Sequence, residues 1–156
     1  MNKMRIFFLL ALVSTFVYAC KDKTPDDQNT PVEPKYKSEN LVDHQWEITA
    51  LTATGIGDIW NNSMFVKDCN KDNTYRFKSN NILTTLDTPL KCNSADPDST
   101  SGPYALIDNN TKIYLNISLG GVVVNDTSDI TQLDETTMKL NIDYSGIPGQ
   151  ITFKRK

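Results

Sequence analysis

The sequence lacks the marks of several common protein classes. It contains a single histidine, His44, no Cys-x-x-Cys pair, no P-loop and no dinucleotide-binding glycine motif. Lys and Arg total 16 against 19 Asp and Glu, so there is no basic excess for nucleic acid. The carboxylates lie mostly in predicted turns, and none forms a pair spaced for acid-base work. We therefore expect no enzyme, no cofactor, no metal site and no nucleic-acid partner.

The first apolar run is too short for a membrane span, which needs roughly 20 residues. It covers residues 6–17, follows two basic residues, and has the length of a signal-peptide core. The Ala19-Cys20 pair that ends it resembles a bacterial lipobox. The resemblance implies that residues 1–19 are a signal peptide and that Cys20 carries the lipid. An ordinary secretory signal cut nearby, or an uncleaved anchor, is the alternative.

Residues 20–40 are rich in proline and charge and poor in large apolar side chains. Such a segment cannot bury enough surface to offset its ordering entropy, so we expect a flexible tether between the lipid and a folded domain. Cys20-Lys21-Asp22 also resembles the short signal that exports lipoproteins of Bacteroidetes-type bacteria to the cell surface. These features predict a protein of the bacterial cell envelope, anchored to the outer membrane and facing either the periplasm or the exterior.

Residues 41–156 are dominated by two-residue alternation, which is typical of β-strands. In the first strand, for example, Trp46, Ile48 and Ala50 are expected to share one face. Turns are expected at 79–81, 108–111 and 146–149, and residues 56–69 read as a loop or a short helical turn. The expected strands are 46–50, 74–78, 82–86, 104–107, 112–118, 122–133 with a bulge, 138–144 and 151–155. They predict an all-β, eight-stranded antiparallel up-and-down barrel, with a Greek-key β-sandwich as the alternative.

The order of the landmarks resembles the small lipocalin-like lipoproteins of Bacteroidetes-type bacteria. Trp46 opens the first strand, Gly102-x-Tyr104 follows the cysteines, and Phe153-x-Arg155 ends the chain. The resemblance covers residues 41–156 and implies a lipocalin-like barrel. One departure stands out, because lipocalins carry a glycine two residues before this tryptophan and this chain has His44.

If Cys20 is lipidated, two cysteines remain. In an oxidising envelope, Cys69 and Cys92 are expected to form a disulfide, with a redox or metal pair as the less favoured alternative. Asp68, Asn70 and Asp72 match the opening of a calcium-binding loop. The glycine and glutamate of such a loop are missing, which favours a polar turn.

An apolar stripe on the predicted strands either lines a ligand cavity or forms plain core. Its ligand-binding candidates are Trp46, Ile48, Tyr75, Phe77, Tyr104, Leu106, Met138 and Leu140. The first functional hypothesis is therefore an envelope protein that binds a small hydrophobic ligand. The second is a protein-interaction, accessory or inhibitor module with a filled barrel, in which loops such as 56–69 and 92–102 contact the partner.

Overall fold

A computed structural model describes residues 32–87, 90–119 and 122–156 of the chain. The expected signal peptide, the lipidated Cys20, the tether up to residue 31 and the Gly120-Gly121 break lie outside these residues. Among the described residues, no helix combines the length and apolar character needed to cross a bilayer. The elements are η1 (Ser38–Asn40), β1 (Gln45–Ala53), β2 (Gly57–Asp58), η2 (Asp68–Asn70), β3 (Thr74–Lys78), β4 (Ile82–Leu86), β5 (Ser99–Ile107), β6 (Lys112–Leu119), β7 (Val122–Leu133), β8 (Thr137–Tyr144) and β9 (Ile147–Arg155).

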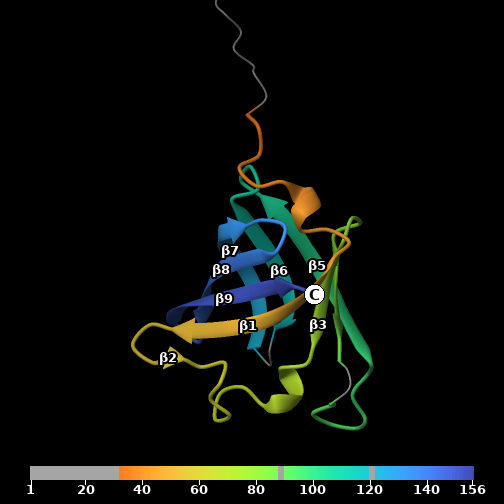
Figure 1. Cartoon of the computed structure of the whole chain (residues 1–156), viewed down its shortest axis with the longest axis vertical. Helices are drawn as coiled ribbons and strands as arrows, with labels where there is room; N and C mark the ends of the chain where they lie inside the picture. The colour runs from red at the N-terminus through yellow and green to blue at the C-terminus, as the bar shows by residue number, and fades with distance from the viewer. Residues whose placement is uncertain (1–31, 88–89, 120–121) are drawn as a thin grey trace, which may run out of the picture. The chain divides into compact units, whose positions relative to one another are not determined.

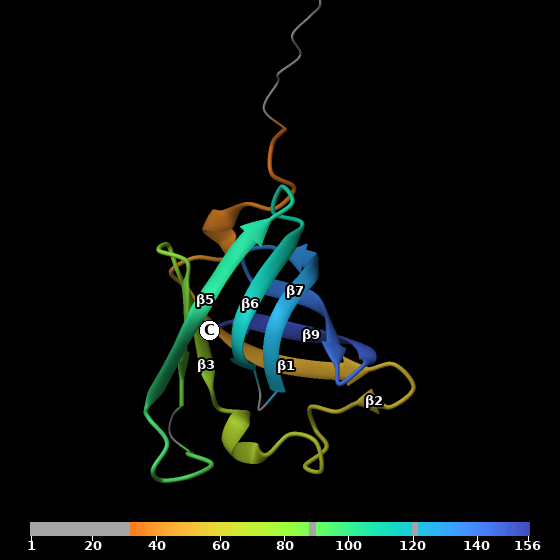
Figure 2. The same ribbon diagram turned by 180° about the vertical axis from the view of Figure 1, so that it is seen from behind.

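The strands close into an eight-stranded antiparallel barrel (Figures 1 and 2). From β3 to β9 each strand pairs with its neighbour in the chain, and β1 closes the ring by pairing with both β3 and β9. The two-residue β2 lies outside this count, because it pairs only with the end of β1. This confirms the predicted up-and-down barrel, and the Greek-key alternative is wrong.

Alternating side chains from all eight strands fill the interior, as a period of two requires. The four largest fully buried side chains are aromatic: Trp46, Tyr75, Phe77 and Phe153. Phe77 meets the ring of Tyr104 edge to face at 5.2 Å and that of Phe153 at 6.4 Å. Edge-to-face contacts of this kind stabilise a core beyond the area they bury.

The first strand changes its inward face partway along. Its register against β9 shifts between Ile48 and Ala50, as a β-bulge does when it adds one residue to a strand. Beyond the shift, Leu51 and Ala53 are buried while Ala50 is only half-buried. The prediction that Ala50 shares the face of Trp46 is therefore wrong.

The last turn is shorter than the expected 146–149. Ser145 (φ 53°) and Gly146 (φ 86°) connect β8 to β9, and both are left-handed, as a tight two-residue hairpin requires. Residues 147–149 belong to β9 instead. Gly149 is required there, because a Cβ would stand 2.4 Å from the carbonyl oxygen of Thr52 on β1.

One end of the barrel, which we call the closed end, is sealed by η1 and the residues around it. Leu41 is fully buried beneath the start of β1, and its carbonyl accepts a 3.1 Å hydrogen bond from Trp46 Nε1. The turn into β1 needs no glycine at His44. Asp43 instead adopts the left-handed conformation (φ 61°) and donates its N–H to the Phe77 carbonyl at 2.7 Å.

Part of the expected tether packs on the barrel at this end. Asn109 donates its side-chain amide to the Glu33 carbonyl, and Asn110 donates its amide to the Tyr36 carbonyl at 2.8 Å. Lys35 also donates its N–H to the Asn109 carbonyl. The compact unit accordingly begins at Val32 rather than at residue 41. The sequence alone does not predict this packing of residues 32–40, because the contacts are made by polar groups that carry no apolar pattern.

Candidate functional site

The opposite end of the barrel, which we call the open end, carries the longer connections. β1 ends there at Ala53 and β6 at Leu119, and the described residues of the β4–β5 and β8–β9 connections lie there as well. The chain from 54 to 73, which we call the capping segment, lies at this end between β1 and β3 (Figure 1). It contains β2 and η2 in the place where the sequence predicts a loop or a short helical turn.

Three apolar side chains attach the capping segment to the barrel. Ile59, Trp60 and Val66 are buried in the core. The N–H groups of Ile59 and Trp60 both donate to the Leu51 carbonyl of β1, at 2.9 and 3.1 Å. The segment therefore supplies hydrogen bonds to β1 beyond the point where β1 pairs with β3.

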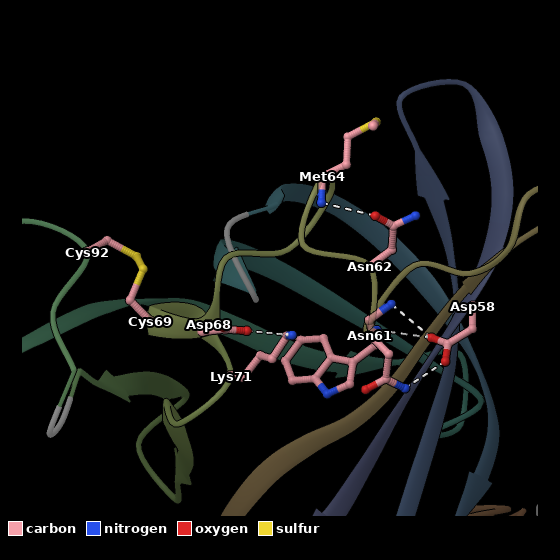
Figure 3. A network of polar contacts seen from close by, with 9 residues as sticks. Asp58, Asn61, Asn62, Met64, Asp68, Cys69, Lys71 and Cys92 are labelled. Carbon is pink, nitrogen blue, oxygen red and sulfur yellow. Dashed lines mark hydrogen bonds and ion pairs between the residues drawn. A yellow bond between two sulfur atoms is a disulfide. The ribbon is translucent and has the colours of Figure 1, made fainter.

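Short-range polar contacts fix the shape of the capping segment (Figure 3). Asp58 accepts hydrogen bonds from the Trp60 N–H at 2.9 Å and from the Asn61 side-chain amide at 2.6 Å. These bonds, that of the Asn61 amide above all, lower the pKa of the Asp58 carboxyl. Asn62 accepts from the Met64 N–H, in the same kind of side-chain turn.

A disulfide joins the capping segment to the β4–β5 connection (Figure 3). It links Cys69 to Cys92 across 23 positions of sequence, as expected. Asp68, beside Cys69, forms an ion pair with Lys71 and is largely exposed. Asp68 is therefore engaged in its own turn, which agrees with the polar-turn interpretation of the Asp68-x-Asn70-x-Asp72 spacing.

The barrel wall parts between β7 and β8 at the open end. Their pairing runs only from Leu133–Met138 to Asp129–Asn141. From there outward, β7 pairs with β6 alone and β8 with β9 alone among the described residues. A hollow of about 610 Å³ lies between the separated strands, lined by residues 123–128 and 142–145. We call this feature the wall opening, and its volume falls within the range of small-molecule sites.

The wall opening has an apolar floor and a polar rim. Val124, Ser128 and Ile142 are buried at its base. The register of β7 against β6 places Asp126 opposite the buried Leu115, so Asp126 belongs to the inner face of the strand although it is exposed. The described lining includes two carboxylates and no lysine or arginine. Its electrostatic field favours neutral or cationic ligands over anions.

Tyr144 connects the wall opening to the capping segment. The residue lines the hollow, and its ring meets that of Phe65 edge to face at 6.4 Å. Phe65 itself packs half-buried against the core. A movement of the capping segment would therefore change one side of the hollow.

The eight ligand-binding candidates of the apolar stripe lie mainly in the packed interior. Tyr104 and Leu106 line a separate hollow of about 360 Å³ near the closed end, together with Val42 and Asn81. Tyr104 donates its hydroxyl to the Lys78 carbonyl at 2.7 Å, and burial, assisted by the charge of Asp43, raises the pKa of the phenol. The candidates that are 3% exposed or less are Trp46, Ile48, Tyr75, Phe77, Tyr104, Met138 and Leu140. Their role in ligand binding stays a prediction.

Sequence reasoning missed the wall opening, although one signal was present. Inward positions on β7 alternate as Val124, Asp126, Ser128 and Ile130, so two polar residues interrupt an otherwise apolar face. A polar pair at core-facing positions marks a place where the wall is open to solvent.

The remaining polar candidates make hydrogen bonds within turns. His44 Nε2 lies 3.2 Å from the Glu39 carbonyl oxygen at the closed end, far along the barrel from the capping segment. Asp134 accepts hydrogen bonds from Gln132 and Thr136, which lower its pKa to about 2. Within the described ranges, no group of three or more His, Cys, Asp and Glu side chains could hold a metal ion.

A closed up-and-down barrel with one sealed end and one hollowed end defines the class of small calyx-like β-barrels. The lipocalin-like domain family matches residues 42–140, and the chain belongs to this family. Lipocalin-like domains usually act as binding proteins rather than enzymes. No curated protein matches the chain.

Proposed function

We propose that this chain is a lipid-anchored envelope protein whose barrel binds a small amphipathic molecule at the open end. One observation carries the proposal: the strands β7 and β8 separate around a hollow of about 610 Å³ with a buried apolar floor. The site differs from the stripe of the sequence analysis, because that stripe is occupied by its own ring contacts.

The lining suggests what such a ligand looks like. Val124 and Ile142 offer an apolar surface, while Asn125, Thr127 and Ser145 bring hydrogen-bonding groups to the same hollow. The absence of lysine and arginine from the described lining disfavours fatty acids and other anions. We infer an amphipathic ligand with a neutral or cationic polar group.

Two features of the cysteine residues support the location. The lipobox-like Ala19-Cys20 pair follows a signal-like apolar run. The disulfide between Cys69 and Cys92 is of the kind that persists in oxidising compartments such as the bacterial periplasm or the cell surface. Both features fit anchorage at the outer membrane.

A dye titration tests the ligand site. The compact unit from Val32 to Lys156 is titrated with N-phenyl-1-naphthylamine, a neutral apolar dye that fluoresces when it leaves water. Asp126→Phe places a ring in the wall opening and is expected to weaken dye binding at least about tenfold. Asp129→Phe, on the outer face of the same strand, is the matched control and should stay within about twofold. Equal affinities for the two variants, or no dye binding, would contradict the proposal.

A second candidate function is a protein-interaction module. It is favoured by three exposed apolar side chains at the open end: Met64 at 85% exposure, Val123 at 78% and Leu90 at 60%. Exposed apolar side chains that lie together mark recognition surfaces, whereas single ones are normal, and a crosslinking experiment distinguishes the two. If they contact a protein, Met64→Asp should abolish a crosslink that the wild-type chain forms in its own membranes, while Val32→Asp, at 79% exposure beyond the closed end, should leave it intact.

A further inference from the structure

Four buried side-chain oxygens near the disulfide have no hydrogen-bond partner among the described residues. They are Asp72 Oδ1, Asn73 Oδ1, Thr85 Oγ1 and Asp87 Oδ1. The side chains of Asn73 and Thr85 are only 9% and 5% exposed. Leaving a buried acceptor unpaired costs about 1–3 kcal/mol, so four in one region call for an explanation.

Strand pairing brings these residues together. β3 and β4 pair through Tyr75–Thr85 and Thr74–Leu86, so Asn73 and Asp87 are the next positions along the two strands. The Asp87 N–H donates to the Asp98 carbonyl, which continues the β4–β5 ladder through Asp87. Because side chains alternate, Asn73, Thr85 and Asp87 fall on the inner face with Tyr75.

Asp72 belongs to the same cluster, because its carboxylate contacts Leu90, three residues after Asp87. Its second carboxylate oxygen, Oδ2, accepts a 2.8 Å hydrogen bond from the Leu90 N–H. The disulfide between Cys69 and Cys92 connects the two segments that carry these side chains. The four oxygens are thus held by β3, β4 and a covalent link, and not by a single loop.

The chemistry of this group is one-sided. Carboxylate and amide oxygens only accept hydrogen bonds, and the Thr85 hydroxyl can donate one, so the cluster cannot satisfy all four oxygens by itself. The nearest described lysines in sequence are engaged elsewhere: Lys71 Nζ pairs with Asp68, and Lys91 Nζ with Asp98. A bound cation would satisfy several acceptors at once, whereas a water molecule can donate only two hydrogen bonds.

We propose that Asp72, Asn73, Thr85 and Asp87 form a calcium-binding site that fixes the base of the open end. Ca²⁺ accepts six to eight oxygen ligands, mixes carboxylate with neutral oxygens, and tolerates irregular geometry, whereas Mg²⁺ demands a near-ideal octahedron. Backbone carbonyls and water complete the coordination. With two carboxylates, the site belongs with the weaker extracellular calcium modules, with a Kd of about 10⁻⁴–10⁻³ M.

This site is not the loop suggested by the Asp68-x-Asn70-x-Asp72 spacing. Of those three residues only Asp72 contributes, and its partners are Asn73, which directly precedes β3, Thr85 in β4, and Asp87, which directly follows β4. The assignment is also independent of the ligand proposed for the wall opening, which uses residues of β7 and β8. Either can fail without the other.

Calorimetry and thermal unfolding test the site. The full chain, purified in a neutral detergent and freed of metal with EDTA, is titrated with CaCl₂. We expect heat of binding and a rise of about 5–10 °C in Tm at saturation. Asp87→Asn should weaken Ca²⁺ binding at least about tenfold, because it removes one of two charged ligands.

The control is Asp68→Asn, which changes an exposed aspartate on the neighbouring turn and should leave calcium affinity within about twofold. In EDTA, Asp87→Asn should equal or exceed the wild-type Tm, because it removes a buried charge; in Ca²⁺ the order should reverse. This reversal separates a ligand from a residue that merely supports the fold. An unchanged Tm and no heat with Ca²⁺, meaning that water alone fills the cluster, would overturn the proposal. So would an equal response to MgCl₂.

Discussion

The closed and open ends of this barrel, built from the same eight strands, differ in how their buried polar groups are hydrogen-bonded. At the closed end, polar groups find partners within the chain: Trp46 Nε1 binds the Leu41 carbonyl, and Asn110 binds the Tyr36 carbonyl. At the open end, β7 and β8 separate around a hollow and four buried oxygens are left without partners among the described residues. Within the part of the chain that the structure describes, the unpartnered buried side-chain oxygens all lie at the open end, which makes this the end available for binding.

The largest expected difference in unfolding free energy between the two ends is found by replacing Trp46. Trp46→Ala removes a fully buried ring and its hydrogen bond to Leu41, and should lower the free energy of unfolding by about 3–5 kcal/mol. Met64→Ala, at an 85% exposed position of the open end, should change it by less than about 0.5 kcal/mol. Urea unfolding of both variants measures the difference. Similar losses of unfolding free energy in the two variants would contradict this difference between the ends.

The disulfide is the next largest contribution and belongs to the open end. Replacing Cys69 and Cys92 together by serine should cost about 3 kcal/mol, since the bridge closes a loop of roughly 24 residues. Hydrogen exchange should quicken first in the capping segment and hardly at all around Leu41. If exchange quickened equally at both ends, the bridge would be supporting the whole barrel rather than one end of it.

The smallest expected effect is a pH dependence of stability that comes from Asp134 at the closed end. Hydrogen bonds from Gln132 and Thr136 lower the pKa of Asp134 to about 2, from an ordinary value of 3.8. A lowered folded-state pKa gives stability that is present above about pH 4 and is lost as pH falls through 2. Because the group is near the surface, solvent screening limits this to less than about 1 kcal/mol.

Urea midpoints measured between pH 6 and pH 2 test this contribution. Asp134→Ala should flatten the pH dependence, whereas Asp129→Ala, which changes an exposed aspartate of the strand β7 that precedes this turn, should leave it as in the wild type. Identical profiles for the two variants would contradict the assignment. The Asp134 turn lies at the closed end, so dye binding in the wall opening should be unaffected by either change.

The strands, their order and the disulfide could be predicted from the sequence because each depends on a local pattern or on a count. Alternation identified the strand from 138 to 144, and two remaining cysteines allowed one pairing. The bulge near Ala50 could not be predicted, because no residue in β1 marks it. The consequence of His44 could not be predicted either: lipocalins carry a glycine at this place, whereas here the neighbouring Asp43 takes the left-handed conformation.

The wall opening and the cluster of buried oxygens were harder to predict from the sequence, because each is formed by a pair of strands. The alternation of Asp126 and Ser128 does not specify where β7 and β8 stop pairing, since that depends on the register of two strands. Likewise, Asn73 and Asp87 are neighbours only after β3 and β4 pair. The residues of both sites are visible in the sequence, but their proximity is a property of the closed barrel.

Hydrogen exchange with and without saturating N-phenyl-1-naphthylamine tests the central claim, that binding belongs to the open end, most directly. The unit from Val32 to Lys156 is compared in the two states, peptide by peptide. The account predicts slower exchange in residues 123–128 and 142–145 and no change in residues 38–46 at the closed end. Slower exchange confined to the closed end, or none at the wall opening, would contradict it.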